Sequence, residues 1–541
     1  MQIDKVSIRT ICCLALCAAI SNADIFDEVE QRNRQRDIFE SLSKDPTKNV
    51  ENFEVPEVTP SKPNEDEKCF YIRNIVVLDA TLLNKSHINE VTSKYLNKCD
   101  SLSDLKNLTN EINSLYIDKG YITSQVYLSS QNIAKGDLTF QAVEGRVNNI
   151  DPQKLYVANA FIGQKNDHLN IRDVESAIEN INRLPSNHAT MKLNPSEKVG
   201  YTDIVVENSP TRRFGGSIGV DNYGSEKTGK AQVNSRLNFD NVIGINDQAN
   251  VFFNFSNRYF EDENSKGNGY DYSFPVGKTT ITFSQRNNRF EQKVRSGNSV
   301  FLSQGATKTY TFDTQYKLYH DQKNRINIGA SVANYKTRNY FGYIYLESSS
   351  YRLSKLTLSA DYLYQIPGFY TFINFAYVRG VDLFQNYHST ELNDEYEIYN
   401  ISLSAMKDFY LFRYSLSAYI QFTDDSLFGS DKISIGGPYS IRGFGKEGLS
   451  GNEGYYIRNE LSYNAHYEIF GGISNSYFVA LDGGEINSDE DSFGGRLIGY
   501  SFGTKLQSKN LEASLHYDMP LYKKDVNKAE KFFGASFRIR F

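Results

Sequence analysis

The sequence predicts two small α+β domains followed by a transmembrane β-barrel of about sixteen antiparallel strands. Residues beyond Pro210 alternate apolar and polar side chains in several segments of about ten residues or more, the length that a tilted strand needs to cross a bilayer. Residues 68–209 instead mix helical and strand patterns over short distances. Aromatic residues are plentiful, with 38 Tyr, 35 Phe and no Trp, although the mean hydropathy of -0.51 is hydrophilic. Long apolar runs are therefore scarce.

The N-terminus has the pattern of a secretory signal peptide. Lys5 and Arg9 precede an apolar run from Ile11 to Ile20, and the small residues of Ser21-Asn22-Ala23 follow. We expect cleavage after Ala23, so that residues 1–23 are removed on export. No later stretch approaches the ~18 apolar residues that a membrane-spanning helix requires. If the mature chain spans a membrane, it does so with strands.

Two cysteines remain after this cleavage. Cys12, Cys13 and Cys17 leave with the signal peptide, whereas Cys69 and Cys99 stay in the mature chain. One even pair in an exported protein predicts a disulfide, which we expect to fasten the first strand of the domain that begins near residue 68 to its helical region. The alternative is two separately buried thiols.

The first segment of the mature chain, residues 24–44, has helix-forming composition with charge on nearly every face. Such a helix has little core to join, so it lies either in a water-filled space or as a frayed terminal arm. Residues 45–67 contain Pro46, Pro56, Pro60 and Pro63 among acidic residues, which predicts an extended linker.

Residues 68–147 and 148–209 are the two predicted α+β domains. Expected elements of the first domain are strands at 72–78, 122–128 and 138–143 and helices at 88–96 and 102–118. Expected elements of the second domain are a helix at 171–181 and strands at 190–193 and 202–207.

Residues 210–541 form the predicted barrel. In the clearest strand, even positions from Tyr410 to Phe422 are apolar and opposite a more polar face, as expected for one face in lipid and one in a polar lumen. A soluble β-sandwich also alternates, but its strands average about five or six residues. Strand starts are expected near residues 213, 229, 247, 268, 278, 307, 324, 350, 370, 396, 410, 453, 475, 494, 510 and 532.

The connections between these strands differ in length. Those near Ile366 to Gly368 and Met406 to Asp408 are tight, whereas residues 424–452 form one long loop. Short periplasmic turns and longer outer loops are typical of outer-membrane barrels. The last strand places Phe537, Ile539 and Phe541 on one face, which predicts a C-terminal barrel signal facing lipid.

Three long stretches resemble the transporters of two-partner secretion, the TpsB or ShlB/FhaC/HecB family. The first domain contains LTNEINSLYIDKGYITSQVYLSSQNIAKGDLTFQAVEGRV and is similar to the first POTRA domain of the family. The second contains LNIRDVESAIENINRLPSNHATMKL and is similar to the second POTRA domain. The barrel opens with RRFGGSIGVDNYGSEKTGK, similar to the first strand and turn of the family.

Two short motifs also resemble this family. Ile441-Arg442-Gly443-Phe444, in the long loop, is similar to its [VI]RG[YF] loop tip. Phe478 followed by Asp482-Gly483-Gly484 is similar to its Asp-x-Gly motif on the barrel wall. The resemblance implies that the loop folds back into the lumen and that Arg442 pairs with Asp482.

Physical chemistry supports this pairing. An arginine in a narrow lumen is partly desolvated, and a two-point contact with a carboxylate repays that cost. Gly443 leaves room for the tip to approach the wall. The alternative is that Arg442 is an exposed loop arginine and Asp482 a lumen-facing charge.

The resemblance further implies a bacterial outer-membrane transporter whose POTRA domains lie in the periplasm. Residues 24–44 would then be a helix that plugs the pore. The expected partner is a secreted exoprotein of haemolysin, adhesin or contact-dependent toxin type, captured unfolded by the POTRA domains. Outer-membrane lipid, and the barrel-assembly machinery during biogenesis, are further expected partners.

Other functions are less well supported by the sequence. An outer-membrane insertion factor of the same superfamily would normally carry more than two POTRA domains and lack the plug. A passive porin has no use for POTRA domains. An enzyme is not expected, because HExxH and GxxxxGK[ST] motifs are absent and the 7 His are scattered without metal-ligand spacing. His168 and His188 are expected at the domain surface. We expect no cofactor, no metal and, at a net charge of -6, no nucleic acid.

Overall fold

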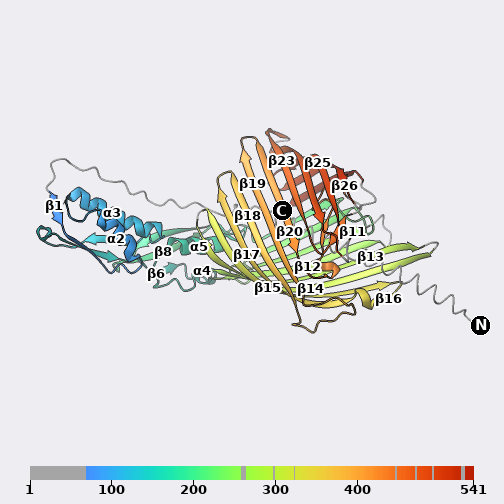
Figure 1. Cartoon of the computed structure of the whole chain (residues 1–541), viewed down its shortest axis with the longest axis horizontal. Helices are drawn as coiled ribbons and strands as arrows, with labels where there is room; N and C mark the ends of the chain where they lie inside the picture. The colour runs from blue at the N-terminus through green and yellow to red at the C-terminus, as the bar shows by residue number, and fades with distance from the viewer. Residues whose placement is uncertain are drawn as a thin grey trace, which may run out of the picture.

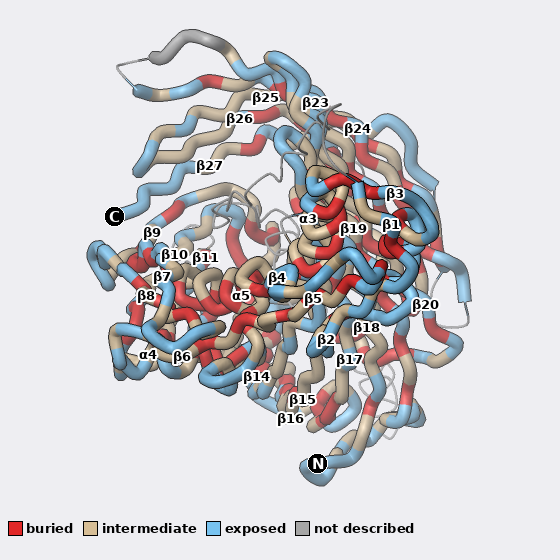
Figure 2. The backbone as a smooth tube through the Cα atoms, turned by 90° about the vertical axis from the view of Figure 1, so that its left-hand side faces the viewer, coloured by how far each residue is buried: buried red, intermediate tan, exposed pale blue. Residues whose placement is uncertain are grey.

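The computed structural model describes residues 69–257, 263–296, 299–321, 323–444, 448–469, 472–489, 493–524 and 530–541. The predicted signal peptide (1–23), plug helix (24–44) and linker (45–67) lie outside the described residues. The described chain is elongated, with two small α+β domains extending from one end of a β-barrel (Figure 1). Figure 2 views the molecule from this end, with the domains in front of the barrel strands.

The first domain packs two helices on a three-stranded sheet of order β2-β5-β4, with a separate pair β1-β3. Helix α3 begins with a capping box between Ser101 and Asp104. It buries Leu108, Ile112 and Tyr116 along one face, at the spacing of one helical stripe. The elements are β1 (Cys69–Ile72), β2 (Asn74–Leu78), α2 (Lys85–Ser93), β3 (Lys98–Ser101), α3 (Leu102–Asp118), β4 (Gln125–Leu128), η2 (Ile133–Lys135) and β5 (Asp137–Val143).

The second domain has a three-stranded sheet of order β6-β8-β7. Its elements are β6 (Arg146–Asp151), α4 (Leu155–Ala160), α5 (Ile171–Asn182), β7 (Ala189–Pro195) and β8 (Tyr201–Asn208). The predicted boundary between residues 147 and 148 was wrong by a few residues, because β6 already belongs to the second sheet. Among the described residues, no helix is long and apolar enough to cross a bilayer.

Sixteen long strands close the barrel in the described part of the chain, and the last strand, β27, pairs with the first, β9. The predicted strand number and antiparallel order are confirmed. The two-residue β16 (Ile344–Tyr345) only extends the edge of β15. The long strands are β9 (Phe214–Asp221), β10 (Gln232–Asp240), β11 (Gln248–Asn257), β12 (Asn264–Val276), β13 (Thr279–Ser296), β14 (Ser299–His320), β15 (Asn324–Phe341), β17 (Tyr351–Ile366), β18 (Phe369–Val381), β19 (Glu397–Phe409), β20 (Phe412–Phe422), β23 (Gly454–Ile469), β24 (Ile473–Ile486), β25 (Gly495–Gln507), β26 (Leu511–Lys523) and β27 (Phe532–Arg540).

The predicted strand starts fall within a few residues of the observed ones, with β14 as the exception. It begins at Ser299 rather than near residue 307. The tight turn expected at Met406 to Asp408 was also misplaced, because β19 continues to Phe409 and the turn lies at Tyr410-Leu411. Tyr410 has φ 56°, a left-handed conformation that closes this two-residue turn.

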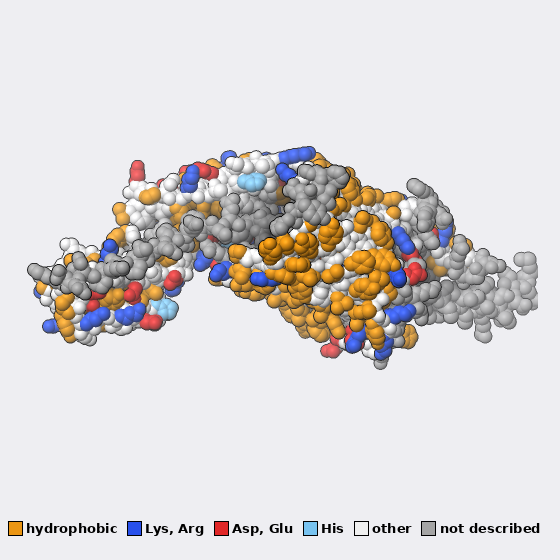
Figure 3. All heavy atoms as spheres, turned by 90° about the horizontal axis from the view of Figure 1, so that it is seen from above, with side chains coloured by type: hydrophobic (Ala, Val, Ile, Leu, Met, Phe, Trp, Pro, Cys, Tyr) orange, Lys and Arg blue, Asp and Glu red, His pale blue; other side chains and the backbone are white. Residues whose placement is uncertain are grey.

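The strands turn an apolar face outward and a polar face inward. Leu358 on β17 is 47% exposed, whereas Asp361, on the other face of the same strand, is 8% exposed. Figure 3 shows hydrophobic side chains spread over the visible side of the barrel and charged side chains towards its ends. This is the pattern expected of a barrel in lipid.

Candidate functional site

The loop between β20 and β23 lies against the inner wall of the barrel. Within it, β21 (Ile433–Ile435) pairs with β22 (Leu449–Gly451). Ile441 and Phe444 of the loop tip are buried at 0% and 1% exposure in a cluster with Ile486 and Leu497 of the wall strands. The loop tip is therefore packed into the barrel rather than extended into solvent.

Arg442 and Asp482 form a two-point ion pair in this position. Arg442 Nε donates to Asp482 Oδ2 at 2.6 Å, and Nη2 donates to Oδ1 at 2.8 Å. The backbone N–H of Arg442 also donates to Oδ2 at 3.1 Å. The side chains are 5% and 0% exposed. Three hydrogen bonds thus join one loop residue to one wall carboxylate away from water.

A second wall carboxylate completes the arginine site. Arg442 Nη1 donates to Oε2 of Glu460, a residue of β23, at a distance of 3.0 Å. Lys505 of β25 binds the other carboxylate oxygen of Glu460. The sequence motifs did not indicate Glu460 or Lys505. Their only signal is that each is a charged residue on a lumen-facing strand position, which many other residues share.

Arg458, also missed from the sequence, binds the backbone of the tip. It lies on β23, is 7% exposed, and donates from Nη1 to the carbonyl oxygens of Pro438 at 2.9 Å and Ser440 at 3.1 Å. These contacts hold the chain just before Arg442 in the conformation that presents the guanidinium to Asp482.

Glycines allow this close approach. Gly443 has φ 94°, and a Cβ there would lie 2.6 Å from the backbone of Met519 on β26. A Cβ on Gly484 would lie 2.9 Å from Ile441 Cδ1. The ring of Phe478 lies 5.9 Å from the guanidinium carbon of Arg442. The structure therefore brings both predicted motifs together at one point of the wall.

The second α+β domain is hydrogen-bonded directly to the turns at the nearer end of the barrel. Arg183 Nη2 donates to the carbonyl oxygens of Asn246 at 2.7 Å and Ser273 at 2.9 Å. Asn180 donates to the carbonyl oxygen of Gly277 at 2.6 Å, and the Gly277 N–H donates to the carbonyl oxygen of Asn159 in the second domain at 2.9 Å. These bonds fix the position of the domain on the barrel mouth.

A buried ion cluster reinforces this docking. Glu179 of α5 binds Lys317 Nζ at 2.5 Å and Arg325 Nη1 at 2.6 Å, and His320 Nε2 lies 3.7 Å away. Burial alone raises the pKa of Glu179, but the positive charges of Lys317 and Arg325 outweigh it and lower the pKa from 4.5 to about 2. Glu179 is therefore ionised at neutral pH.

Glu144 connects the two α+β domains. Its carboxylate accepts hydrogen bonds from Leu82 N–H at 2.7 Å and from the Tyr116 hydroxyl at 3.1 Å. Burial, and then the charge of Glu144, raise the pKa of Tyr116, so the hydroxyl stays protonated and donates. His168 of the second domain lies 3.6 Å from Glu144 and its side chain is 21% exposed, whereas His188 is exposed at the surface.

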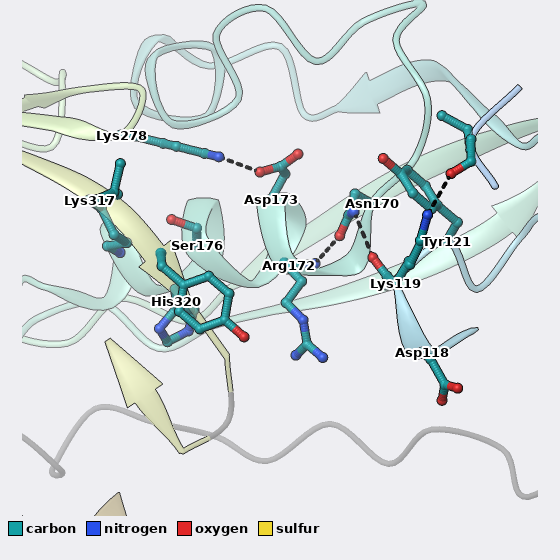
Figure 4. A pocket seen from close by; sticks show the side chains of 13 residues that line it. Asp118, Lys119, Tyr121, Asn170, Arg172, Asp173, Ser176, Lys278, Lys317 and His320 are labelled. Carbon is teal, nitrogen blue, oxygen red and sulfur yellow. Dashed lines mark hydrogen bonds and ion pairs between the residues drawn. The ribbon is translucent and has the colours of Figure 1, made fainter. Parts of the chain in front are cut away.

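A pocket of about 460 Å³ lies where the two domains and the barrel meet (Figure 4). Asn170 at the start of α5 donates to the carbonyl oxygen of Lys119 at 3.1 Å. Lys278 from the barrel binds Asp173 of α5 at 2.6 Å. Two lysines of this pocket, Lys278 and Lys317, therefore join the barrel to the second domain.

Cys69 and Cys99 are joined by a disulfide. We expected the bond to fasten the first strand to the helical region. Cys99 instead lies on β3, which pairs with β1, so the bond links two paired strands. Sequence alone missed β3 because it is only four residues long.

The C-terminal residues close the barrel. Phe537 and Ile539 face outward at 40% and 46% exposure, and the ring of Phe541 lies 6.2 Å from that of Phe214 on β9. Phe541 also exchanges two backbone hydrogen bonds of 3.0 Å with Gly216. Among the described residues, no group of three or more His, Cys, Asp and Glu side chains is placed to hold a metal ion.

Comparison with known families agrees with this architecture. The family model described as haemolysin secretion/activation protein ShlB/FhaC/HecB matches residues 200–506. The chain belongs to this family. A ShlB-type POTRA domain model matches residues 70–145, and a second POTRA model matches residues 139–195. The predicted family is confirmed.

Relatives match over most of their length. The outer membrane transporter CdiB of Dickeya dadantii is 28% identical over 465 residues, covering 84% of this chain and 83% of the relative. The hemolysin transporter protein HpmB of Proteus mirabilis is 25% identical over 477 residues, covering 85% of this chain and 83% of the relative. The chain is thus an outer-membrane protein with periplasmic POTRA domains, as predicted.

Solved structures share the fold. CdiB from Escherichia coli superposes with a TM-score of 0.87 at 23% identity, covering 95% of this chain and 98% of that structure. CdiB from Acinetobacter baumannii gives a TM-score of 0.77 at 20% identity and covers 100% of both chains. The POTRA-plus-barrel fold class predicted from the sequence is confirmed.

Proposed function

We propose that this chain is the outer-membrane pore of a two-partner secretion system and carries an unfolded partner exoprotein out of the periplasm. The docking of the second POTRA domain on the barrel turns is the observation that carries the proposal. Because Arg183 and Glu179 bond this domain to the barrel, a polypeptide captured by the POTRA domains is held at the barrel mouth. The exoprotein is of the haemolysin, adhesin or contact-dependent toxin type.

Capture uses a free strand edge of the first POTRA domain. Within the described residues, β2 has one neighbouring strand, β5, and it exposes Val76 and Leu78 at 39% and 44%. An unfolded chain that adds to this edge gains main-chain hydrogen bonds that need no particular sequence. The β4 edge is less suitable, because Val126 N–H already donates to Asn113 of α3 at 2.7 Å.

Passage requires the lumen to be cleared. The loop tip is held against the inner wall by the ion pair of Arg442 and Asp482. We infer that the tip shifts when the exoprotein enters. Residues 24–44 would act as a second plug. The sequence has no nucleotide-binding GxxxxGK[ST] motif, so folding of the exoprotein outside the cell supplies the driving force.

The remaining contacts of the chain follow from the same proposal. The outward aromatic and aliphatic face contacts outer-membrane lipid, and the C-terminal Phe541 signal engages the barrel-assembly machinery during biogenesis. The protein has no catalytic role and binds no nucleic acid. An insertion factor of the same superfamily is the alternative, but the family model that matches residues 200–506 and the matched transporters favour secretion.

Secretion of the partner exoprotein tests the proposal. Cells that produce both proteins should release the exoprotein into the medium, and cells that lack the transporter should retain it. Leu78→Glu should reduce release, because it places a charge on the proposed β2 edge. Val199→Glu, at an 87% exposed position of the second domain, is the matched control and should have no effect. Release without the transporter would refute the function, and equal effects of both variants would refute the β2 edge.

A further inference from the structure

The base of the lumenal loop is fixed to a different part of the wall from its tip. Asp431 lies in the short helix η4 (Gly429–Asp431) and forms an ion pair with Lys355 of β17. Its other carboxylate oxygen accepts a hydrogen bond from the Tyr396 hydroxyl at 2.8 Å. The Lys355 and Asp431 side chains are 7% and 3% exposed. The loop therefore carries a second buried ion pair.

Apolar residues exclude water from this pair. Leu427 and Phe428 of the loop are 1% and 2% exposed and pack with Tyr351 and Leu353 from the wall. The ammonium of Lys355 also lies 4.1 Å from the ring centre of Tyr335. A charge left here without its partner has no access to solvent. Removing the charge of either Lys355 or Asp431 must therefore weaken the attachment of the loop.

The two attachments of the loop are separate. Arg442 binds Asp482 on β24, whereas Asp431 binds Lys355 on β17, and β18, β19, β20 and β23 lie between these strands in the barrel. The apolar residues around the two ion pairs also form two distinct clusters. Nothing in their contacts requires both ion pairs to break together.

We propose that Lys355 and Asp431 are positioning residues that hold the base of the loop on β17 while the tip moves. When the ion pair between Arg442 and Asp482 breaks, the tip is free to pivot about the fixed base. The base keeps Arg442 within reach of Asp482, so that the pair can form again when transport ends. The inference rests on the proposed function of the loop as a gate of the pore.

Two buried serines permit a test that does not depend on secretion. Ser430 beside the base anchor is 6% exposed, and Ser440 in the tip is 0% exposed. We would change each separately to cysteine and measure its reaction with a fluorescent maleimide in outer-membrane preparations. The native Cys69 and Cys99 are joined in a disulfide and do not react.

The two anchors should open independently. Lys355→Met should raise the labelling rate of Ser430→Cys by about tenfold or more and leave that of Ser440→Cys unchanged. Arg442→Ala should raise labelling at 440 and not at 430. Lys355→Arg, which keeps the charge, should restore most of the protection at 430. If either variant opens both sites, or if Lys355→Met leaves 430 protected, the inference is wrong.

Asp361→Asn is the matched control. Asp361 is a buried, inward-facing charge on the same strand as Lys355, but its hydrogen bonds run to Gln315 of β14 and Asn374 of β18 rather than to the loop. It should change labelling at neither site. If Lys355→Met fails to give a heat-modifiable barrel, the isosteric Asp431→Asn takes its place. Independent opening without any loss of exoprotein secretion would refute the proposed gate but not the two anchors.

Discussion

Arg442 in the loop tip and Asp482 on β24 bind each other at two points, with Nε 2.6 Å from Oδ2 and Nη2 2.8 Å from Oδ1. They are 40 residues apart in the sequence, and both are almost completely buried. Glu460 gives the guanidinium a second carboxylate at 3.0 Å. A planar group with several fixed donors is needed to satisfy both acids at once.

Arg442→Lys should therefore impair secretion although it keeps the charge. A lysine ammonium cannot reproduce the planar contact with Asp482 and also reach Glu460. The strand ladder does not depend on this contact, so the barrel should still assemble. Exoprotein in the medium, normalised to heat-modifiable barrel in the membrane, measures the effect. Wild-type secretion by this variant would show that only the positive charge matters.

Glu179→Gln should loosen the second POTRA domain on the barrel. The change leaves Lys317 and Arg325 without their shared carboxylate, and a broken buried pair costs about 3 to 5 kcal/mol. Hydrogen exchange in α5 of the detergent-solubilised protein should become faster. Glu207→Gln, which removes the partner of Lys192 in an exposed pair, should leave α5 protected.

The same contact predicts a pH dependence. The pKa of Glu179 is lowered from 4.5 to about 2 in the folded protein, so its contribution to stability is present above about 4.5 and is lost as the pH falls towards 2. Protection of α5 that depends on Glu179 should be constant from pH 7 to about 5 and should decline below that. A decline that is equally large in Glu179→Gln would assign it to other groups.

The disulfide between Cys69 and Cys99 should stabilise the first POTRA domain. It closes a loop with a sequence separation of 30, for which chain entropy predicts about 3 to 4 kcal/mol. Peptide mapping of the non-reduced protein by mass spectrometry should find one linked pair of peptides. Two free thiols would contradict the structure. Cys69→Ala should make this domain more sensitive to protease than the second domain.

Deletion of residues 24–44 should raise the conductance of the barrel in planar bilayers. A helix about 10 Å across fills much of such a pore. The deleted protein should still be heat-modifiable, because the described strands from β9 to β27 already close the barrel. Unchanged conductance would place the segment outside the lumen.

The strands were predictable because lipid imposes a period of two on them. Tyr410 to Phe422 and Phe537 to Phe541 carry this pattern in the sequence, and the observed starts of β20 and β27 lie close to the expected ones. The start of β14 was missed by several residues. Polar residues such as Ser303 and Gln304 occur near the start of that long strand, where the alternation of apolar and polar residues is weak.

The partners of the loop were only partly predictable. Motif resemblance indicated Arg442 and Asp482, but it gave no sign of Glu460 or of the pair formed by Lys355 and Asp431. Inward-facing charges look alike in sequence, and which of them meet depends on the register of strands far apart in the chain. The docking of Arg183 was also hidden, because it binds backbone carbonyls that carry no sequence signal.

The coupling between Arg442 and Asp482 tests the central claim most directly, through exoprotein secretion per heat-modifiable barrel in Arg442→Ala, Asp482→Ala and the double variant. Arg442→Ala leaves Asp482 as a buried unpaired charge, whereas Asp482→Ala leaves Arg442 with Glu460, so the second loss should be equal or smaller. If the pair acts as one latch, the double variant should secrete as well as Arg442→Ala. Losses that multiply in the double variant would show that the two residues act separately and would contradict the latch.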